Sequence, residues 1–210
     1  MSRSLPRAFF ARPAVEVAPA LLGNVLVRAV RGGRRIAARI VETEAYEEGD
    51  PASHSFRGKT ARNAVMFGPS GHLYMYFTYG LHFCANVVTG EMGEGSAVLL
   101  RAAEPLEGLD LMARRRGVPE PGLLCSGPAR LAQAFGLDLR HDGLDLAGGG
   151  TVWVERGTPI PAERIAGGPR VGIRYGTERP WRFLATGNPY LSRGGAGSVR
   201  GRERAARPTP

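Results

Sequence analysis

The sequence of 210 residues has little cysteine, lysine or tryptophan. Cys84 and Cys125 are the only cysteines, so a disulfide framework is excluded and a reducing compartment is expected. Lys59 is the only lysine among 28 basic residues, and all the others are arginines. No apolar run approaches the roughly 20 residues of a transmembrane helix. The length suits one domain that buries a single substantial core.

The basic residues give a formal net charge of +9 and an isoelectric point near 10.5. An excess of this size indicates a polyanionic partner, most often nucleic acid. Arginine suits phosphate because its planar fork reaches two oxygens at once. A base-composition bias in the coding DNA explains the ratio of arginine to lysine but not the net charge. We therefore expect an intracellular, DNA-associated protein of the cytoplasm or nucleoid.

Apolar alternation and turn residues predict a mixed α+β fold. Gly32 and Gly33 separate two β-rich segments, 25–30 and 35–46, which predicts a hairpin. Further strands are expected at 72–78, 81–89, 96–102, 152–155, 170–175 and 181–186. Helices are expected at 106–116 and at 126–135, the second capped by Ser126 and ended by Gly136. The glycine- and arginine-rich end predicts one domain over residues 1–192 and a basic, disordered tail over 193–210.

One expected strand carries Glu42, Glu44 and Tyr46 on alternate residues. Alternate strand side chains share a face, so these three point the same way. The opposite face would carry Val41, Thr43 and Ala45. Two carboxylates about 7 Å apart are costly to bury unless each is paired or used in chemistry. The alternative is an exposed strand with two solvated glutamates, and this segment by itself leaves both interpretations open.

Residues 72–86 combine aromatic side chains with a second expected hairpin. Tyr74 and Tyr76 share a face, and Tyr79 stands beside Gly80 at the turn. Aromatic side chains in a basic setting stack on nucleic-acid bases, and a hairpin tip can insert a wedge between them. Cross-strand packing is the alternative for Tyr74 and Tyr76, whereas Tyr79 at the tip has less to pack against. The loop 47–71 precedes this hairpin, and loops of such length are usually functional.

Short segments in a fixed order along the chain carry a resemblance. They are 21–28 (LLGNVLVR), 39–46 (RIVETEAY), His54-Ser55, Arg62-Asn63, Met66-Phe67, 74–86, 98–108, 124–128 (LCSGP) and 170–172 (RVG). Together they resemble the alkyladenine (methylpurine) DNA glycosylase family over about residues 9–192. The resemblance implies a single mixed domain with a curved, mostly antiparallel sheet, surrounding helices and a protruding β-hairpin that enters the minor groove.

The family excises alkylated or deaminated purines from duplex DNA by flipping the nucleotide into a pocket. On this resemblance Glu44 is the general base that activates the attacking water. Arg101 and the main-chain carbonyl of Val171 would position that water. The transition state is oxocarbenium-like, and a nearby carboxylate stabilises it. Because alkylated purines leave readily, one carboxylate is enough, and Glu42 would have a structural or tuning role.

The resemblance also assigns residues to the flipped purine and to the duplex. The pocket would be lined by Tyr46, His54 and Tyr76. Asn86 would screen against the amino group of guanine. Tyr79 would fill the gap left in the duplex, and Leu81 would act as an apolar wedge just after the turn.

The sequence further predicts a monofunctional enzyme without a cofactor. Glycosylases that also nick the strand usually form a Schiff base through an amine, and Lys59 and the N-terminus are the only candidates. The four histidines lack zinc spacing, and the zinc deaminase signature is absent. We expect a monomeric hydrolase of base excision repair that needs no metal, binds double-stranded DNA containing a damaged purine and contacts no membrane.

Two other functions stay open at the level of sequence. A non-catalytic nucleic-acid binder would keep the fold and the basic face, but Glu44 and Arg101 would then lack a purpose. A carbohydrate glycosidase would use Glu42 and Glu44 as an inverting pair, but the net charge of +9 and the scarcity of tryptophan argue against it. Release of free base from duplexes containing hypoxanthine or alkylated adenine separates the first alternative from catalysis. Steep salt dependence of binding would favour DNA over sugar.

Overall fold

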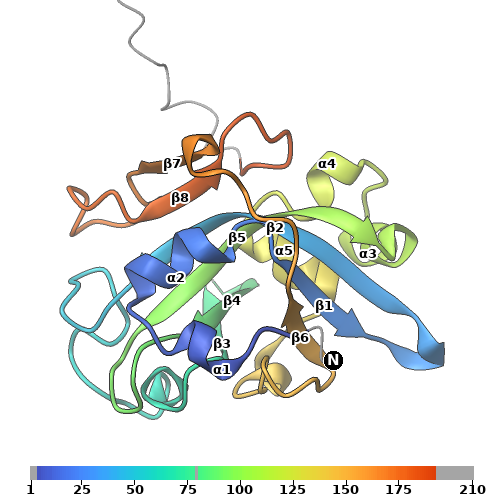
Figure 1. Ribbon diagram of the computed structural model, residues 1–210. Coiled ribbons are helices and arrows are strands. Elements are labelled where there is room, and N and C mark those ends of the chain that lie inside the picture. Colours follow the sequence, from blue (N-terminus) through green and yellow to red (C-terminus); the bar gives the residue numbers. More distant parts are fainter. Residues whose placement is uncertain (1–3, 79, 193–210) are drawn as a thin grey trace, which may run out of the picture.

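The computed structural model describes residues 4–78 and 80–192, and it forms one mixed α+β domain (Figure 1). An open antiparallel sheet of eight strands runs through it in the order β3-β4-β5-β2-β1-β6, with β8 paired to β2 and β7 to β8. The predicted fold class is therefore confirmed. The predicted tail at 193–210 lies outside the described residues.

The strands are β1 (Val25–Ala29), β2 (Arg35–Tyr46), β3 (Leu73–Thr78), β4 (His82–Val88), β5 (Ala97–Glu107), β6 (Val152–Glu155), β7 (Ile165–Gly168) and β8 (Arg182–Ala185). The α-helices are α1 (Arg7–Phe10), α2 (Ala14–Leu21), α3 (Leu109–Arg116), α4 (Pro121–Leu124) and α5 (Pro128–Phe135). The 3₁₀ turns are η1 (Arg31–Gly33), η2 (Ala64–Phe67), η3 (Leu139–His141) and η4 (Ala162–Arg164). Among the described residues, every helix is too short to cross a membrane.

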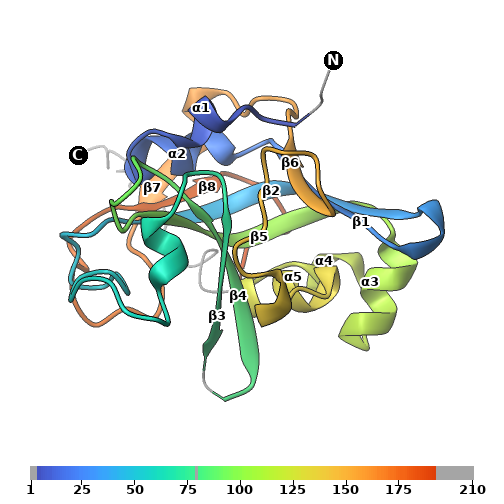
Figure 2. The ribbon, with the colours of Figure 1, turned by 90° about the horizontal axis from the view of Figure 1, so that it is seen from below.

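Both predicted hairpins are present. The first joins β1 to β2 through η1, and the second joins β3 to β4. Figure 2 shows the β3–β4 hairpin extending away from the rest of the domain. Gly80 has a left-handed backbone with φ of 67°, which a glycine adopts without strain. Tyr79, the other predicted turn residue, lies outside the described residues.

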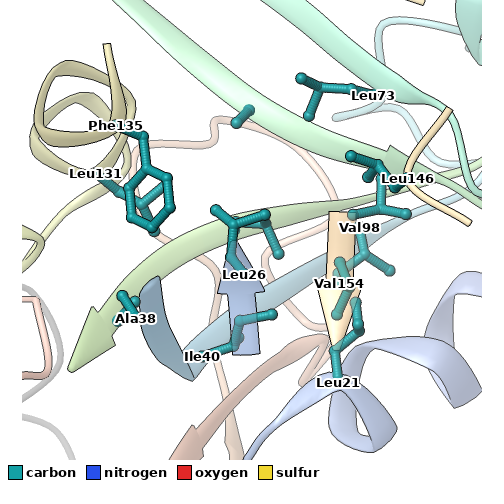
Figure 3. Close-up of a cluster of buried hydrophobic side chains, with 14 of the residues drawn as sticks. Leu21, Leu26, Ala38, Ile40, Leu73, Val98, Leu131, Phe135, Leu146 and Val154 are labelled. Atoms are coloured by element: carbon teal, nitrogen blue, oxygen red, sulfur yellow. The ribbon is translucent and has the colours of Figure 1, made fainter. Parts of the chain in front are cut away.

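Helices α2 and α5 pack against the sheet and share its main core (Figure 3). Leu131 and Phe135 of α5 approach Leu26 of β1 in that view, and Ile40 of β2 lies close by. All four side chains are fully buried. Apolar area removed from water stabilises a core by about 25 cal/mol per Å². This packing therefore holds in place the strands that carry the polar residues of the site.

Two predicted helix starts are wrong. The helix predicted from residue 106 begins at Leu109, because β5 continues to Glu107 and Gly108, with φ of 74°, makes the turn between them. Pro105 sits inside β5, where the pairing with β4 has already ended at Leu99, and an open strand side tolerates proline. Ser126 does not cap α5 either; Gly127 holds that position.

The strand predicted at 170–175 is absent, and these residues form bends and irregular backbone. Gly172 and Gly176 have positive φ values of 76° and 65°, which interrupt an extended strand. The guanidinium of Arg170 binds the buried carboxylate of Asp50, which fixes the path of this segment. β7 forms instead at Ile165–Gly168 and pairs with β8.

Two of the three register shifts between β2 and β5 change which side chains face the site. Val41 is an extra residue on β2, and Arg101 is an extra residue on β5. Bulges of this kind re-aim side chains beside functional sites. The prediction that Val41 shares a face with Thr43 and Ala45 is wrong, because those two face α2 and the main core while Val41 packs in a separate cluster with Ala102.

Candidate active site

Glu44 is fully buried near the end of β2, and its carboxylate accepts two short hydrogen bonds. The Val171 main-chain N–H donates to Oε1 at 2.7 Å, and the Tyr46 hydroxyl donates to Oε2 at 2.8 Å. A guanidinium nitrogen of Arg101 lies 3.3 Å from Oε1. The interpretation of solvated glutamates is therefore wrong: this carboxylate is held in one orientation by two hydrogen bonds and one ion pair. The predicted carbonyl role of Val171 stays a prediction, since the observed contact is through its N–H.

Glu42 is also fully buried on the same side of β2 as Glu44. Its Oε1 accepts from Nε of Arg101 at 3.0 Å and from Nε of Arg182 at 2.8 Å. The Ser192 hydroxyl donates to Oε1 at 2.9 Å, and the Ser192 N–H donates to Oε2 at 2.8 Å. Glu42 therefore joins three segments of the chain that lie far apart in sequence.

The three partners of Glu44 border a cavity of about 380 Å³, whereas Glu44 itself lies behind them and is absent from the lining. Its walls include six of the sequence-predicted site residues: Tyr46, His54, Tyr76, Asn86, Arg101 and Val171. The other lining residues are Ala52, Met66, Tyr74, Thr78, Cys84, Ala97, Leu99, Pro128, Gly172 and Ile173. The structure thus brings together residues from the long loop, the β3–β4 hairpin, β5 and the segment after β7.

One wall of the cavity is an aromatic group of three rings. His54 meets Tyr76 edge-on with ring centroids 4.5 Å apart, and its Nδ1 lies 2.9 Å from the Tyr74 hydroxyl. Asn63 donates from its side chain to the His54 carbonyl at 2.8 Å, which fixes the loop that carries the ring. Asn86 lies beside Tyr74 across the hairpin, and its amide donates to the Tyr74 carbonyl at 3.0 Å.

Burial sets the protonation states of these groups. It raises the pKa of Tyr46 far above its usual value, with the charge of Glu44 adding to the effect, so the hydroxyl remains a donor. Burial and then Cys84 raise the pKa of Tyr76. Burial, followed by the positive charge of Arg62, lowers the pKa of His54. Burial alone would lower the pKa of Arg101, but the charges of Glu44 and Glu42 raise it overall.

Arg170 supports the opposite wall behind Tyr46. Its guanidinium stacks on the Tyr46 ring at 4.7 Å and lies 5.3 Å from the Trp181 ring. It binds the carboxylate of Asp50 through both terminal nitrogens and donates to the Ala45 carbonyl at 2.9 Å. Both side chains of this ion pair are completely buried. The ion pair therefore anchors Arg170, and with it the N–H of the adjacent Val171.

Of the two predicted duplex-contacting residues, Leu81 lies between β3 and β4 and is absent from the cavity lining. Leu81 is 76% exposed, which is high for a large apolar side chain and suits a wedge. Tyr79 lies outside the described residues, so its role stays a prediction. Phe77 and Phe83 pack together at 5.1 Å below the tip and stiffen the hairpin.

Four residues that contact the site were not predicted from the sequence. They are Asp50, Cys84, Arg182 and Ser192. Arg182 carried a usable signal, because a charged residue inside the apolar segment 181–185 needs a buried partner. Asp50 and Ser192 lie in turn-rich segments, where such residues are usually exposed. Their partners lie 120 and 150 residues away in sequence, respectively.

Fold and site together define a class of protein: a basic α+β domain with a buried, triply held carboxylate beside an aromatic cavity. The model of the methylpurine-DNA glycosylase family matches residues 8–189. The chain therefore belongs to the methylpurine-DNA glycosylase family.

Several bacterial relatives are provisionally named 3-methyladenine DNA glycosylase. The chain is 55% identical to that of Burkholderia lata over 192 residues, which is 90% of each chain. It is 48% identical to that of Carboxydothermus hydrogenoformans over 189 residues, covering 90% of this chain and 98% of the relative. For Chlorobaculum parvum the identity is 49% over 191 residues, covering 90% and 91%.

Proposed function

We propose that the protein is a monofunctional DNA glycosylase that flips alkylated or deaminated purines out of duplex DNA and hydrolyses their N-glycosidic bond. The observation that carries this proposal is the position of Glu44. Its carboxylate is buried, and all three of its partners line the cavity that would receive the base. Hypoxanthine and 3-methyladenine are the substrates we infer first.

The carboxylate of Glu44 retains hydrogen-bonding capacity for a water. A carboxylate offers about four acceptor positions; hydrogen bonds from Val171 and Tyr46 occupy two of them, and the ion pair with Arg101 covers a third. The fourth would hold the nucleophile against the sugar carbon, with Glu44 taking its proton as the bond forms. The same negative charge stabilises the oxocarbenium-like sugar in a site from which bulk water is excluded.

The cavity walls suit a flat purine. The ring of Tyr46, backed by Arg170, faces the cavity from one side, and Tyr76 and His54 face it from another. Electron-rich aromatic faces favour an electron-poor or cationic ring between them. Asn86 would oppose the guanine amino group sterically, because the hydrogen bond to the Tyr74 carbonyl holds its side chain in place on the cavity wall.

The hairpin would bind the duplex next to the flipped nucleotide. Leu81 projects from it as an exposed apolar side chain, and with Tyr79 it would fill the space the nucleotide leaves. The net charge of +9 would hold the phosphate backbone, so affinity should fall steeply as salt is added. We infer that one copy of the chain acts on each lesion and works in the cell as a base excision repair enzyme.

The structure favours hydrolysis over the alternatives. Lys59 is exposed on the loop that precedes η2 and is absent from the cavity lining, which fits an enzyme without a Schiff-base lyase step. Glu42 accepts hydrogen bonds from four protein donors, which indicates a structural carboxylate and argues against an inverting carbohydrate glycosidase. In a non-catalytic binder, the buried charge of Glu44 would cost desolvation free energy and serve no function.

The experiment is single-turnover release of free base from a duplex that contains hypoxanthine. The wild type should release the base, and Glu44→Gln should lose at least a thousandfold in rate while it still binds the duplex. Glu48→Gln, an exposed carboxylate two residues beyond β2, is the matched control and should be fully active. Full activity of Glu44→Gln would remove Glu44 from the role of general base.

A further inference from the structure

We propose that Glu42 is a positioning residue, which holds Arg101 so that its guanidinium supports Glu44 without covering it. This inference rests on the proposed function, because it explains how the general base is kept available. Neither Glu42 nor Glu44 is among the cavity-lining residues, and Glu42 would act on Glu44 through the guanidinium of Arg101, which both carboxylates share.

The guanidinium of Arg101 is shared among three partners. Nε donates to Glu42 at 3.0 Å, one terminal nitrogen lies 3.3 Å from Glu44, and the other lies 3.4 Å from the Ser192 hydroxyl. The contact to Glu42 is the shorter of its two ion pairs. Glu42 therefore holds Nε and Ser192 holds one terminal nitrogen, while the other terminal nitrogen faces one oxygen of Glu44.

Because the guanidinium is shared among three partners, a competing two-bond contact with Glu44 is disfavoured. Arginine and carboxylate prefer a bidentate fork with two parallel hydrogen bonds. If Arg101 were free to form one with Glu44, it would occupy the acceptor position that a catalytic water needs. Glu42 disfavours that arrangement, because its hydrogen bond to Nε fixes the plane of the guanidinium. The second terminal nitrogen, which an end-on fork would use, already lies 3.4 Å from the Ser192 hydroxyl.

Charge balance supports the same role. The buried group consists of two carboxylates, Glu42 and Glu44, and two guanidinium groups, Arg101 and Arg182. A buried charge is tolerated when it is paired. With Glu42 neutral, the excess positive charge would draw Arg101 toward Glu44, so the change would reach the active site through electrostatics as well as geometry.

The backbone prepares this arrangement through the paired bulges. Val41 and Arg101 are the extra residues of β2 and β5, and they place Glu42 directly opposite Ala102, next to Arg101. Ser192 arrives from the far end of the described chain and closes the group with two hydrogen bonds to Glu42. Ser192 is thereby tied to the site through its hydrogen bonds to Glu42.

The test compares Glu42→Gln with wild type in single-turnover base release and in binding of the same hypoxanthine duplex. A hydrogen bond to a charged group contributes enough to change a rate by about tenfold to a hundredfold, so we expect a loss of that size in the rate constant. The dissociation constant should stay within about twofold, because Glu42 lies outside the cavity. Ser192→Ala, which keeps its N–H bond, should lose severalfold.

Glu155→Gln is the matched control, since Glu155 is a buried carboxylate of β6 that pairs with Arg35 outside the site. It should lose stability yet retain the wild-type rate constant at a temperature where circular dichroism shows it folded. Three results would overturn the inference: a Glu42→Gln rate within twofold of an active wild type, a fall in binding that parallels the fall in rate, or an equal loss in Glu155→Gln. A wild type that releases no base would instead refute the proposed function itself.

Discussion

Removal of the Asp50 carboxylate should destabilise the domain and slow base release through one buried ion pair. In Asp50→Ala, Arg170 would keep the carbonyls of Ala45 and Gly176 but lose its bidentate charged partner. Breaking a fully buried pair costs about 3–5 kcal/mol. Because two carbonyl acceptors remain, we expect about 3 kcal/mol.

The same change should reach Glu44. Arg170 precedes Val171, whose N–H donates to Glu44 at 2.7 Å, and a hydrogen bond to a charged group contributes about 1.5–3 kcal/mol. Loosening that contact should slow single-turnover base release at least about tenfold, since 1.4 kcal/mol corresponds to a factor of ten. Urea unfolding measures the first effect, and base release at a temperature where the variant is folded measures the second.

The double variant Asp50→Ala/Arg170→Met separates charge from packing. It leaves no uncompensated buried guanidinium, so it should recover part of the stability lost in the single variant. It should not recover the rate, because Arg170 also stacks behind Tyr46. A single variant within about 0.5 kcal/mol of wild type, or a double variant less stable than the single one, would refute the reasoning.

Four further outcomes are expected. Tyr46→Phe keeps the ring but removes the donor to Glu44, so base release should slow about tenfold or more with duplex binding unchanged; an unchanged rate would mean that the hydroxyl is dispensable. Burial and Arg62 lower the pKa of His54 below 6.5, so its neutral form stabilises the fold and this contribution should fade as pH drops below 6.5; His54→Asn should show a flatter urea midpoint across pH 5–7.5, and parallel curves would contradict this. Leu81→Ala should leave stability within about 0.5 kcal/mol but reduce flipping, measured by 2-aminopurine fluorescence beside the lesion, and an unaltered signal would exclude a wedge. Asn86→Ser should raise the excision of guanine relative to hypoxanthine, whereas an unchanged ratio would remove Asn86 from guanine discrimination.

Local patterns in the sequence were sufficient for much of the fold. Gly32 and Gly33 marked the first hairpin, and alternation in 72–78 placed Tyr74 and Tyr76 on one face. The predicted helix and strand bounds were wrong where the backbone conformation of one residue, or a partner distant in sequence, decides the local structure. Gly108 delays α3, and Arg170 breaks the expected strand because its partner, Asp50, lies far away in sequence.

The candidate site could be predicted in part for the same reason. Glu44 and Tyr46 fall on one face of a strand by simple alternation, and their hydrogen bond follows from it. The bulges at Val41 and Arg101 could not be predicted, because they depend on the pairing of two strands more than fifty residues apart rather than on either strand alone. The network around Glu42 depends on those bulges, and so it was visible only in the structure.

The most direct test is a crystal structure of Glu44→Gln bound to a duplex that contains hypoxanthine. We expect the damaged nucleotide in the cavity between Tyr46 and the His54–Tyr76 wall, with residue 44 directed at its sugar carbon and a water between them. A hypoxanthine still stacked in the duplex, or a side chain at position 44 turned away from the sugar, would contradict the proposal that Glu44 activates the water.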